Sequence, residues 1–175
     1  MKAGDIVFTY RGSFFTEMIR VVTSRKNDSV KFTHCAVAIS DTMIVDVDFT
    51  TRLVNINDLL KSVKDYEIWS NYVLLTDDTN KISLKAISYL GDEYGFTKLV
   101  PHLLDALLGK ICEQDIFFFR KLLKENRYVI CSWVVSYAFA AINYTFDVDK
   151  QFATPDDIYD SIIKRPEWKK IKNET

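Results

Sequence analysis

Short apolar runs bounded by turn-forming residues dominate the first half of the chain. Ser40, Asp41 and Thr42 separate two of these runs, which is the signal of a β-hairpin. Asn57 stands where it would cap a short helix, 58–63. The pattern therefore predicts mostly β-structure in this half, with strands at 6–10, 33–40, 43–49, 52–56 and 66–75.

Helical periodicity takes over in the second half. Thr154 offers a capping hydroxyl, Pro155 fits a first helical turn, and Asp156 and Asp157 place acids near the positive end of a helix. The most apolar segment, 130–143, is expected to pack on the sheet. Helices are predicted at 13–23, 79–90, 101–109, 115–124, 130–143 and from 155 onward. With no repeat and no linker, the sequence predicts a single α+β domain over residues 1–175.

Charge and glycine usage exclude several classes of function. The chain has 23 Lys and Arg against 24 Asp and Glu, a net charge of −1, whereas nucleic-acid-binding domains normally carry a basic excess. None of the five glycines lies in the phosphate-binding patterns G-x-x-x-x-G-K or G-x-G-x-x-G. We therefore expect no nucleic-acid partner, no ATPase activity and no Rossmann-type cofactor site.

Cysteine usage and the chain start bear on the compartment. Three cysteines with no C-x-x-C spacing argue against a disulfide framework or a zinc site and favour a reducing compartment. The N-terminus has no apolar signal region, and the longest apolar run, 128–142, is shorter than the roughly 20 residues that cross a bilayer. We expect a cytoplasmic protein without an integral membrane segment, a metal or a cofactor.

Histidine-dependent chemistry can use only His34 or His102. His34 begins an apolar strand, and strand alternation places it on one face with Ala36 and Ala38. These small neighbours leave room for another element or a substrate. Taken alone, His34 is more often a structural histidine than a catalytic one, and His102, after Pro101, is unremarkable as an exposed polar residue.

Cys131 lies at the expected first turn of the apolar helix. A helix N-terminus stabilises a thiolate, so a nucleophilic cysteine is well placed there. Cysteine is also among the most buried residue types, and taken alone Cys131 is better interpreted as core. Cys35 points to the face opposite His34, and Cys112 lies in a polar stretch without an obvious partner.

Asp46 and Asp48 interrupt an apolar strand and share one of its faces. If the two strands pair as a hairpin, one of these carboxylates could orient His34. The alternative, a solvated strand face, holds for at least one of them. The residues alone do not decide between Asp46 and Asp48.

Several motifs follow one another in a characteristic order. They are Gly4-Asp5-Ile6-Val7, His34, Ile44-Val45-Asp46, Tyr94-Gly95-Phe96, Cys131-Ser132, Thr154-Pro155-Asp156-Asp157-Ile158 and Trp168. From Gly4 to about Trp168 the chain resembles the circularly permuted branch of the NlpC-type papain-like cysteine hydrolases, the YiiX-like group that also includes a poxvirus subfamily. No single motif is specific, but their order and spacing together are.

The resemblance implies a fold and a set of roles. The fold is a small antiparallel sheet packed against helices, with Cys131 as nucleophile and His34 as base. The family's third polar residue, usually a glutamate, falls on Asp46, and this shorter side chain is a departure. Tyr94, Phe96 and Ser132 would lie at the substrate. The stretch 97–127 is longer than expected and would be a helical lid or an extra packed helix.

The leading hypothesis is a thiol hydrolase that cleaves an amide or ester through an acyl-enzyme. The resemblance implies a peptide, peptidoglycan-fragment or acyl-lipid substrate, and a viral or phage origin is compatible with it. A binding or structural protein that keeps the fold without turnover is the alternative from another class. A lipid acyltransferase or thioesterase, with the aromatic residues around Phe117 as an acyl groove, is the third.

Overall fold

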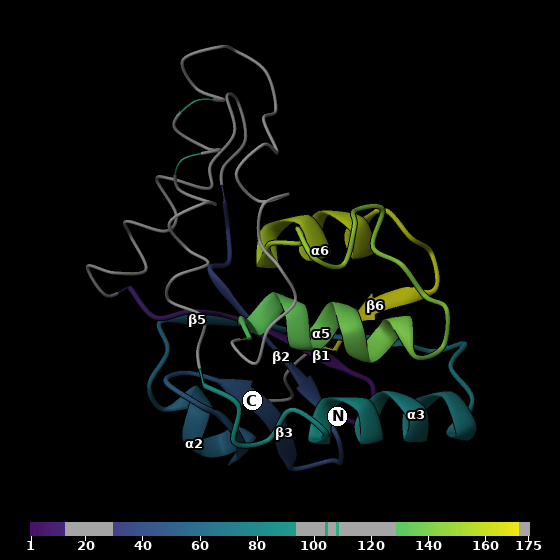
Figure 1. Ribbon diagram of the computed structural model, residues 1–175, viewed down its shortest axis with the longest axis horizontal. Helices are drawn as coiled ribbons and strands as arrows, with labels where there is room; N and C mark the ends of the chain where they lie inside the picture. The colour runs from purple at the N-terminus through teal and green to yellow at the C-terminus, as the bar shows by residue number, and fades with distance from the viewer. Residues whose placement is uncertain (13–29, 94–103, 105–107, 109–128, 172–175) are drawn as a thin grey trace.

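One antiparallel sheet organises the computed structural model, which describes residues 1–12, 30–93, 104, 108 and 129–171. The strands lie in the order β4-β3-β2-β1-β5-β6, and each neighbouring pair is antiparallel (Figure 1). Their bounds are β1 Ile6–Tyr10, β2 His34–Ala38, β3 Met43–Val47, β4 Thr51–Asn55, β5 Asp65–Asn71 and β6 Trp168–Lys170. The described helices are α2 Ile56–Leu60, α3 Thr76–Ile87, α5 Cys131–Ala140 and α6 Pro155–Ile163. This architecture confirms the predicted α+β class.

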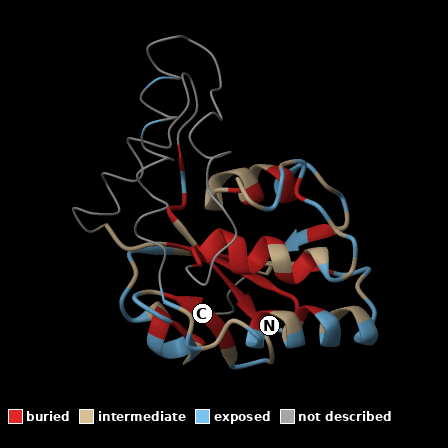
Figure 2. Cartoon of the chain, in the orientation of Figure 1, coloured by how far each residue is buried: buried red, intermediate tan, exposed pale blue. Residues whose placement is uncertain are grey.

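The two faces of the sheet carry separate hydrophobic clusters. The larger one joins Phe8 and Val37 of the sheet to side chains of α3, α5 and α6, and the smaller one joins Val7 and Ala36 to α2. Alternation along β1 and β2 produces this division, because successive side chains point to opposite faces. In Figure 2 the buried colour concentrates on α5 and the central strands. The centre of the molecule is thus the contact between α5 and the sheet.

Helix α5 is apolar around most of its circumference. Its N-cap, Ile130, is extended (φ −118°, ψ 159°), and the Ile130 carbonyl accepts from the N–H groups of Trp133 and Val134 at 3.0 and 3.2 Å. Burial of each large apolar side chain stabilises the fold by roughly 1.5–3 kcal/mol. Eight residues of the helix are buried: Cys131, Ser132, Trp133, Val134, Val135, Ser136, Ala138 and Phe139. Such a helix is fixed by packing, so its first residue is held in place.

The predicted start of the last helix is confirmed in detail. The Asp157 N–H donates to Thr154 Oγ1 at 3.1 Å, and the Thr154 N–H donates to Asp157 Oδ2 at 3.0 Å. These two bonds form a capping box, with Pro155 in the first turn. β6, which follows α6 and pairs with β5 at the sheet edge, was not predicted from the sequence.

Element ends differ from the sequence predictions by a few residues. The cap of α2 is Asn55, whose side chain accepts from the Asn57 N–H at 2.9 Å, so the helix starts two residues before the predicted 58. α3 starts at Thr76 rather than residue 79, because Asp78 Oδ2 accepts from the Leu75 N–H at 3.1 Å. The predicted helices at 13–23 and 115–124 lie outside the described residues. Within the described part of the chain, no helix is both long and apolar enough to span a membrane.

Candidate active site

Cys131 is the first residue of α5 and is 5% exposed. The first N–H groups of a helix have no acceptor within the helix, and they carry its positive partial charge. Negative charge on the Cys131 sulfur, or on an oxygen beside it, is therefore favoured at this position.

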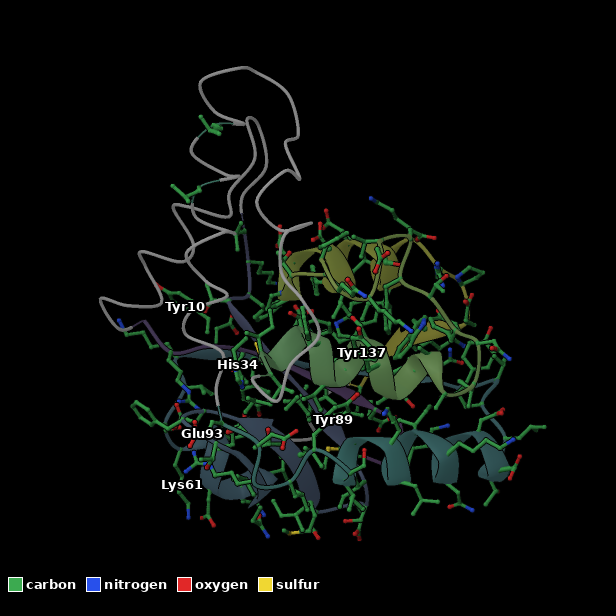
Figure 3. The ribbon with its side chains drawn as sticks, viewed as in Figure 1. Tyr10, His34, Lys61, Tyr89, Glu93 and Tyr137 are labelled. Carbon is green, nitrogen blue, oxygen red and sulfur yellow. The ribbon has the colours of Figure 1, made fainter. Side chains whose placement is uncertain are left out.

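His34 begins β2 and forms a short hydrogen bond with the neighbouring strand. Its Nε2 lies 2.6 Å from Oδ1 of Asp46 on β3, and the His34 side chain is 13% exposed while Asp46 is fully buried. The β2–β3 ladder pairs Val37 with Val45 and Ala38 with Ile44. His34 and Asp46 thus meet at the end of this ladder, and in Figure 3 His34 lies by the N-terminal end of α5.

Two arginines hold Asp46 from its other side. Asp46 Oδ2 lies 3.7 Å from Arg11 Nη2 and 3.6 Å from Arg52 Nη2. The same arginines contact Asp48 Oδ2, at 3.4 Å from Arg11 Nη1 and 3.1 Å from Arg52 Nη2. Asp46 thus joins His34 to the arginine pair. In the described part of the chain, Asp48 makes no hydrogen bond or ion pair with His34. The geometry therefore favours Asp46 over Asp48 as the carboxylate that orients His34.

The pKa values of the imidazole and the carboxylate shift in opposite directions. Burial acts to lower the pKa of His34, but the charges of Cys131 and Asp46 and the hydrogen bond to Asp46 outweigh it and raise that pKa to about 10. Burial acts to raise the pKa of Asp46, yet the charges of His34, Arg11 and Arg52 lower it. The arrangement favours a protonated His34 beside an ionised Asp46.

The pKa of the Cys131 thiol is held well below its ordinary range. A hydrogen bond from the Cys35 thiol is the largest cause, burial opposes it, and the His34 charge lowers the pKa further. Burial and the same contact with Cys131 raise the pKa of Cys35. Together these shifts favour a Cys131 thiolate flanked by a protonated His34 and a neutral Cys35.

Sequence reasoning missed Cys35. Alternation correctly assigns it to the face opposite His34, but that is the face on which α5 packs, and Cys35 and Cys131 belong to the same buried cluster. The signal was available, since a core-facing cysteine beside a strand histidine meets whatever helix covers that face. Nothing in the sequence placed the first turn of α5 over this position.

The remaining predicted site residues divide in two. Ser132 is fully buried, and its hydroxyl has no hydrogen-bond partner within the described part of the chain. Tyr94, Phe96, His102 and the insertion 97–127, apart from residues 104 and 108, lie outside the described residues, as does Cys112. The part played by these residues at the site stays a prediction.

Histidine, cysteine and aspartate side chains are also common metal ligands. Over the described ranges, no group of three or more His, Cys, Asp and Glu side chains is arranged to hold a metal ion. Asp46, His34 and Cys131 instead form a chain of proton-sharing groups with His34 in the middle, and Nε2 of its imidazole is hydrogen-bonded to the Asp46 carboxylate.

Comparisons with known proteins place the fold. No protein-family model matches the chain, and no curated protein matches it. Among solved structures it is similar to the crystal structure of the metalloprotein yiiX from Escherichia coli O157:H7, DUF1105, at 12% identity and a TM-score of 0.66. The match covers 99% of this chain and 97% of that one. The chain therefore shares, over nearly its whole length, the fold of yiiX.

Proposed function

We propose that this protein is a cysteine hydrolase of the permuted papain-like type, in which Cys131 is the nucleophile, His34 the acid and base, and Asp46 the residue that orients His34. The observation that carries the proposal is the meeting of three features at one point. These are a cysteine at the first residue of a buried helix, a lowered pKa of its thiol, and a histidine whose Nε2 is bonded to a buried carboxylate at 2.6 Å.

Each group has a role that follows from its surroundings. Because His34 Nε2 is bonded to Asp46, Nδ1 is the nitrogen free to serve Cys131. The Cys131 thiolate attacks the carbonyl carbon, and N–H groups in the first turn of α5 stabilise the oxyanion. The protonated His34 then gives its proton to the leaving group as the acyl-enzyme forms.

Deacylation reverses these roles. His34, now neutral, takes a proton from water as the water oxygen attacks the acyl carbon, and Cys131 leaves as the thiolate. Asp46 stabilises the imidazolium at both stages. Arg11 and Arg52 keep Asp46 ionised, since their charges lower its pKa.

The bond cleaved is an amide or an ester, in a peptide, a peptidoglycan fragment or an acyl lipid. The likeness to yiiX supports the fold part of this proposal. The name of that protein calls it a metalloprotein, but the donor set found in the described part of this chain does not fit a metal site.

The experiment follows release of p-nitrophenol from an activated ester, with mass spectrometry of the protein. The wild type should release one equivalent in a burst, carry the acyl group on Cys131, and then turn over. Cys131→Ala should give no burst, and Cys112→Ala, which removes a cysteine that the mechanism does not use, should behave as the wild type.

The other outcomes separate the alternatives. A burst that survives in Cys131→Ala, or an acyl group on Cys112, overturns the proposal. Acylation of Cys131 without turnover, on esters and on peptide amides alike, points to the non-catalytic binding protein. Transfer of the acyl group to an added amine or lipid in preference to water points to the acyltransferase.

A further inference from the structure

A second thiol lies against the proposed nucleophile. Cys35 is fully buried on β2, and its side chain shares a hydrogen bond with Cys131 at the start of α5. Both belong to the cluster between the sheet and the helices, and both are free thiols in this structure. The odd cysteine count argued against disulfides in the sequence, but the fold brings two of the three into contact.

We propose that Cys35 and Cys131 form a reversible disulfide when a peroxide oxidises Cys131, and that Cys35 is the resolving cysteine. The proposal rests on the proposed function only for the thiolate character of Cys131. It adds a modification site that hydrolysis does not need.

The chemistry takes two balanced steps. The Cys131 thiolate attacks one oxygen of the peroxide, the O–O bond breaks, and Cys131 becomes a sulfenic acid while hydroxide or an alkoxide leaves. The Cys35 sulfur then attacks the Cys131 sulfur, the S–O bond breaks, and the Cys35 proton departs with the oxygen as water. Cys131 loses two electrons to the peroxide in the first step, and the second step is a condensation.

Local charge assigns the two thiols different roles. His34 and the helix N-terminus stabilise a thiolate on Cys131 and not on Cys35, which is fully buried and donates the hydrogen bond. Cys131 is therefore the sulfur that meets the oxidant. Redox-sensitive cysteines of this kind are commonly poised beside a resolving cysteine.

Position explains why Cys35 can resolve the sulfenic acid. It belongs to a strand paired on one side with β1, where Cys35 faces Phe8, so its backbone is held by the sheet. Cys131 is the first residue of α5 and lies in the same buried cluster as Cys35, so the packing of the helix on the sheet holds the two side chains next to each other. The two thiols already share a hydrogen bond, so the side chains that form the disulfide are neighbours in the reduced protein.

The test treats the full-length protein with one equivalent of hydrogen peroxide, blocks free thiols, and maps the cross-linked peptides by mass spectrometry. We expect a peptide pair joined through Cys35 and Cys131, with the loss of two hydrogen atoms, that dithiothreitol separates. In Cys35→Ser, dimedone should trap the Cys131 sulfenic acid, and labelling should exceed that of the wild type by about tenfold or more, because nothing resolves it. Cys112→Ser is the matched control and should form the same cross-link as the wild type.

Every outcome decides the matter. A cross-link from Cys131 to Cys112, or equal dimedone labelling of the wild type and Cys35→Ser, overturns the assignment of Cys35. Absence of any oxidation of Cys131 overturns the redox proposal, while the ester assay separately reports on hydrolysis. A cross-link in a protein without hydrolase activity leaves this inference standing and removes the proposed function.

Discussion

At the residue scale, the site is a set of charges whose protonation states depend on one another. His34 has a pKa raised from 6.5 to about 10, and the pKa of Cys131 is lowered. A raised histidine pKa contributes stability that is fully present below 6.5 and is lost as the pH rises towards 10. A lowered thiol pKa keeps Cys131 ionised on the acid side of its ordinary range. Between the lowered pKa of Cys131 and the pKa of about 10 of His34, the Cys131 thiolate and the protonated His34 are the dominant forms, as an ion pair.

The pH dependence of Cys131 alkylation should reveal that ion pair. An ordinary thiol loses about tenfold in alkylation rate per pH unit below its pKa of about 8.5. The rate of Cys131 with iodoacetamide should instead stay nearly flat from about pH 6 to about pH 8, because the thiolate is already formed. His34→Ala should restore the steep dependence. Peptide mapping keeps the rates of Cys35 and Cys112 separate, and a steep wild-type profile contradicts the ion pair.

The two neighbouring carboxylates give a matched pair of variants. Asp46→Asn keeps the shape that orients His34 but cannot stabilise the imidazolium, so kcat/KM should fall by roughly 10- to 1,000-fold. Asp48→Asn removes a partner of Arg11 and Arg52 but no contact of His34, so it should stay within about threefold of the wild type.

The activities of Asp46→Asn and Asp48→Asn can be interpreted only together with measurements of folding and of the pH profile. Circular dichroism must first show native structure, since Asp46 is fully buried. Asp46→Asn should also lower the pKa of His34, which moves the alkaline limb of the activity profile to lower pH. Wild-type activity in Asp46→Asn together with a large loss of activity in Asp48→Asn would show that Asp48, and not Asp46, is the carboxylate that orients His34.

At the element scale, features that depend on neighbouring residues could be predicted from the sequence better than features that depend on pairing with distant residues. Strand β1 was predicted with its observed bounds, and the capping box of α6 is written in four consecutive residues, 154–157. β6 has only three residues and forms by pairing with Asn71, Ser70 and Trp69 of β5, which no local pattern announces. For the same reason no local pattern indicates which helix covers Cys35, or that the first turn of α5 does so.

The cap of α6 supports a prediction of its own. Thr154→Ala removes the acceptor of the Asp157 N–H, so it should lower the free energy of unfolding by about 1 kcal/mol in urea denaturation. The control is Thr76→Ala, an exposed residue in the first turn of α3, which should change stability by less than about 0.5 kcal/mol. Equal effects of the two variants would mean that the capping box adds nothing beyond helix propensity.

At the scale of the whole molecule, the two ends of α5 have different surroundings. Its first residue belongs to the candidate site, whereas Phe139 near its last turn makes edge-on ring contacts with Tyr144 and Phe146 and a tilted ring contact with Trp168. Trp168 begins β6, and its Nε1–H donates to the Tyr144 hydroxyl at 2.6 Å. The sheet edge therefore anchors the end of α5 that is away from Cys131. Stability and reactivity should accordingly respond to different substitutions along the same helix.

Trp168→Ala tests this division. Trp168 is 4% exposed, so its removal should cost about 3–5 kcal/mol of unfolding free energy by urea denaturation. The control Leu84→Ala, on α3 with a 68% exposed side chain, should cost less than about 0.5 kcal/mol.

The folded Trp168→Ala protein should nevertheless keep the flat pH profile of Cys131 alkylation, because His34, Asp46 and Cys35 are supplied by the strands at the other end of α5. If Trp168→Ala does not fold, Trp168→Phe keeps an aromatic ring in the cluster and loses the hydrogen bond to Tyr144 together with the contacts of the second indole ring. It should cost about 1–2 kcal/mol and allow the same alkylation measurement. A steep alkylation profile in a natively folded Trp168 variant would show that the protonation of Cys131 depends on how the far end of the helix is held. The thiolate would then be a property of the whole packed core rather than of Cys35, His34 and the Asp46 carboxylate that His34 contacts.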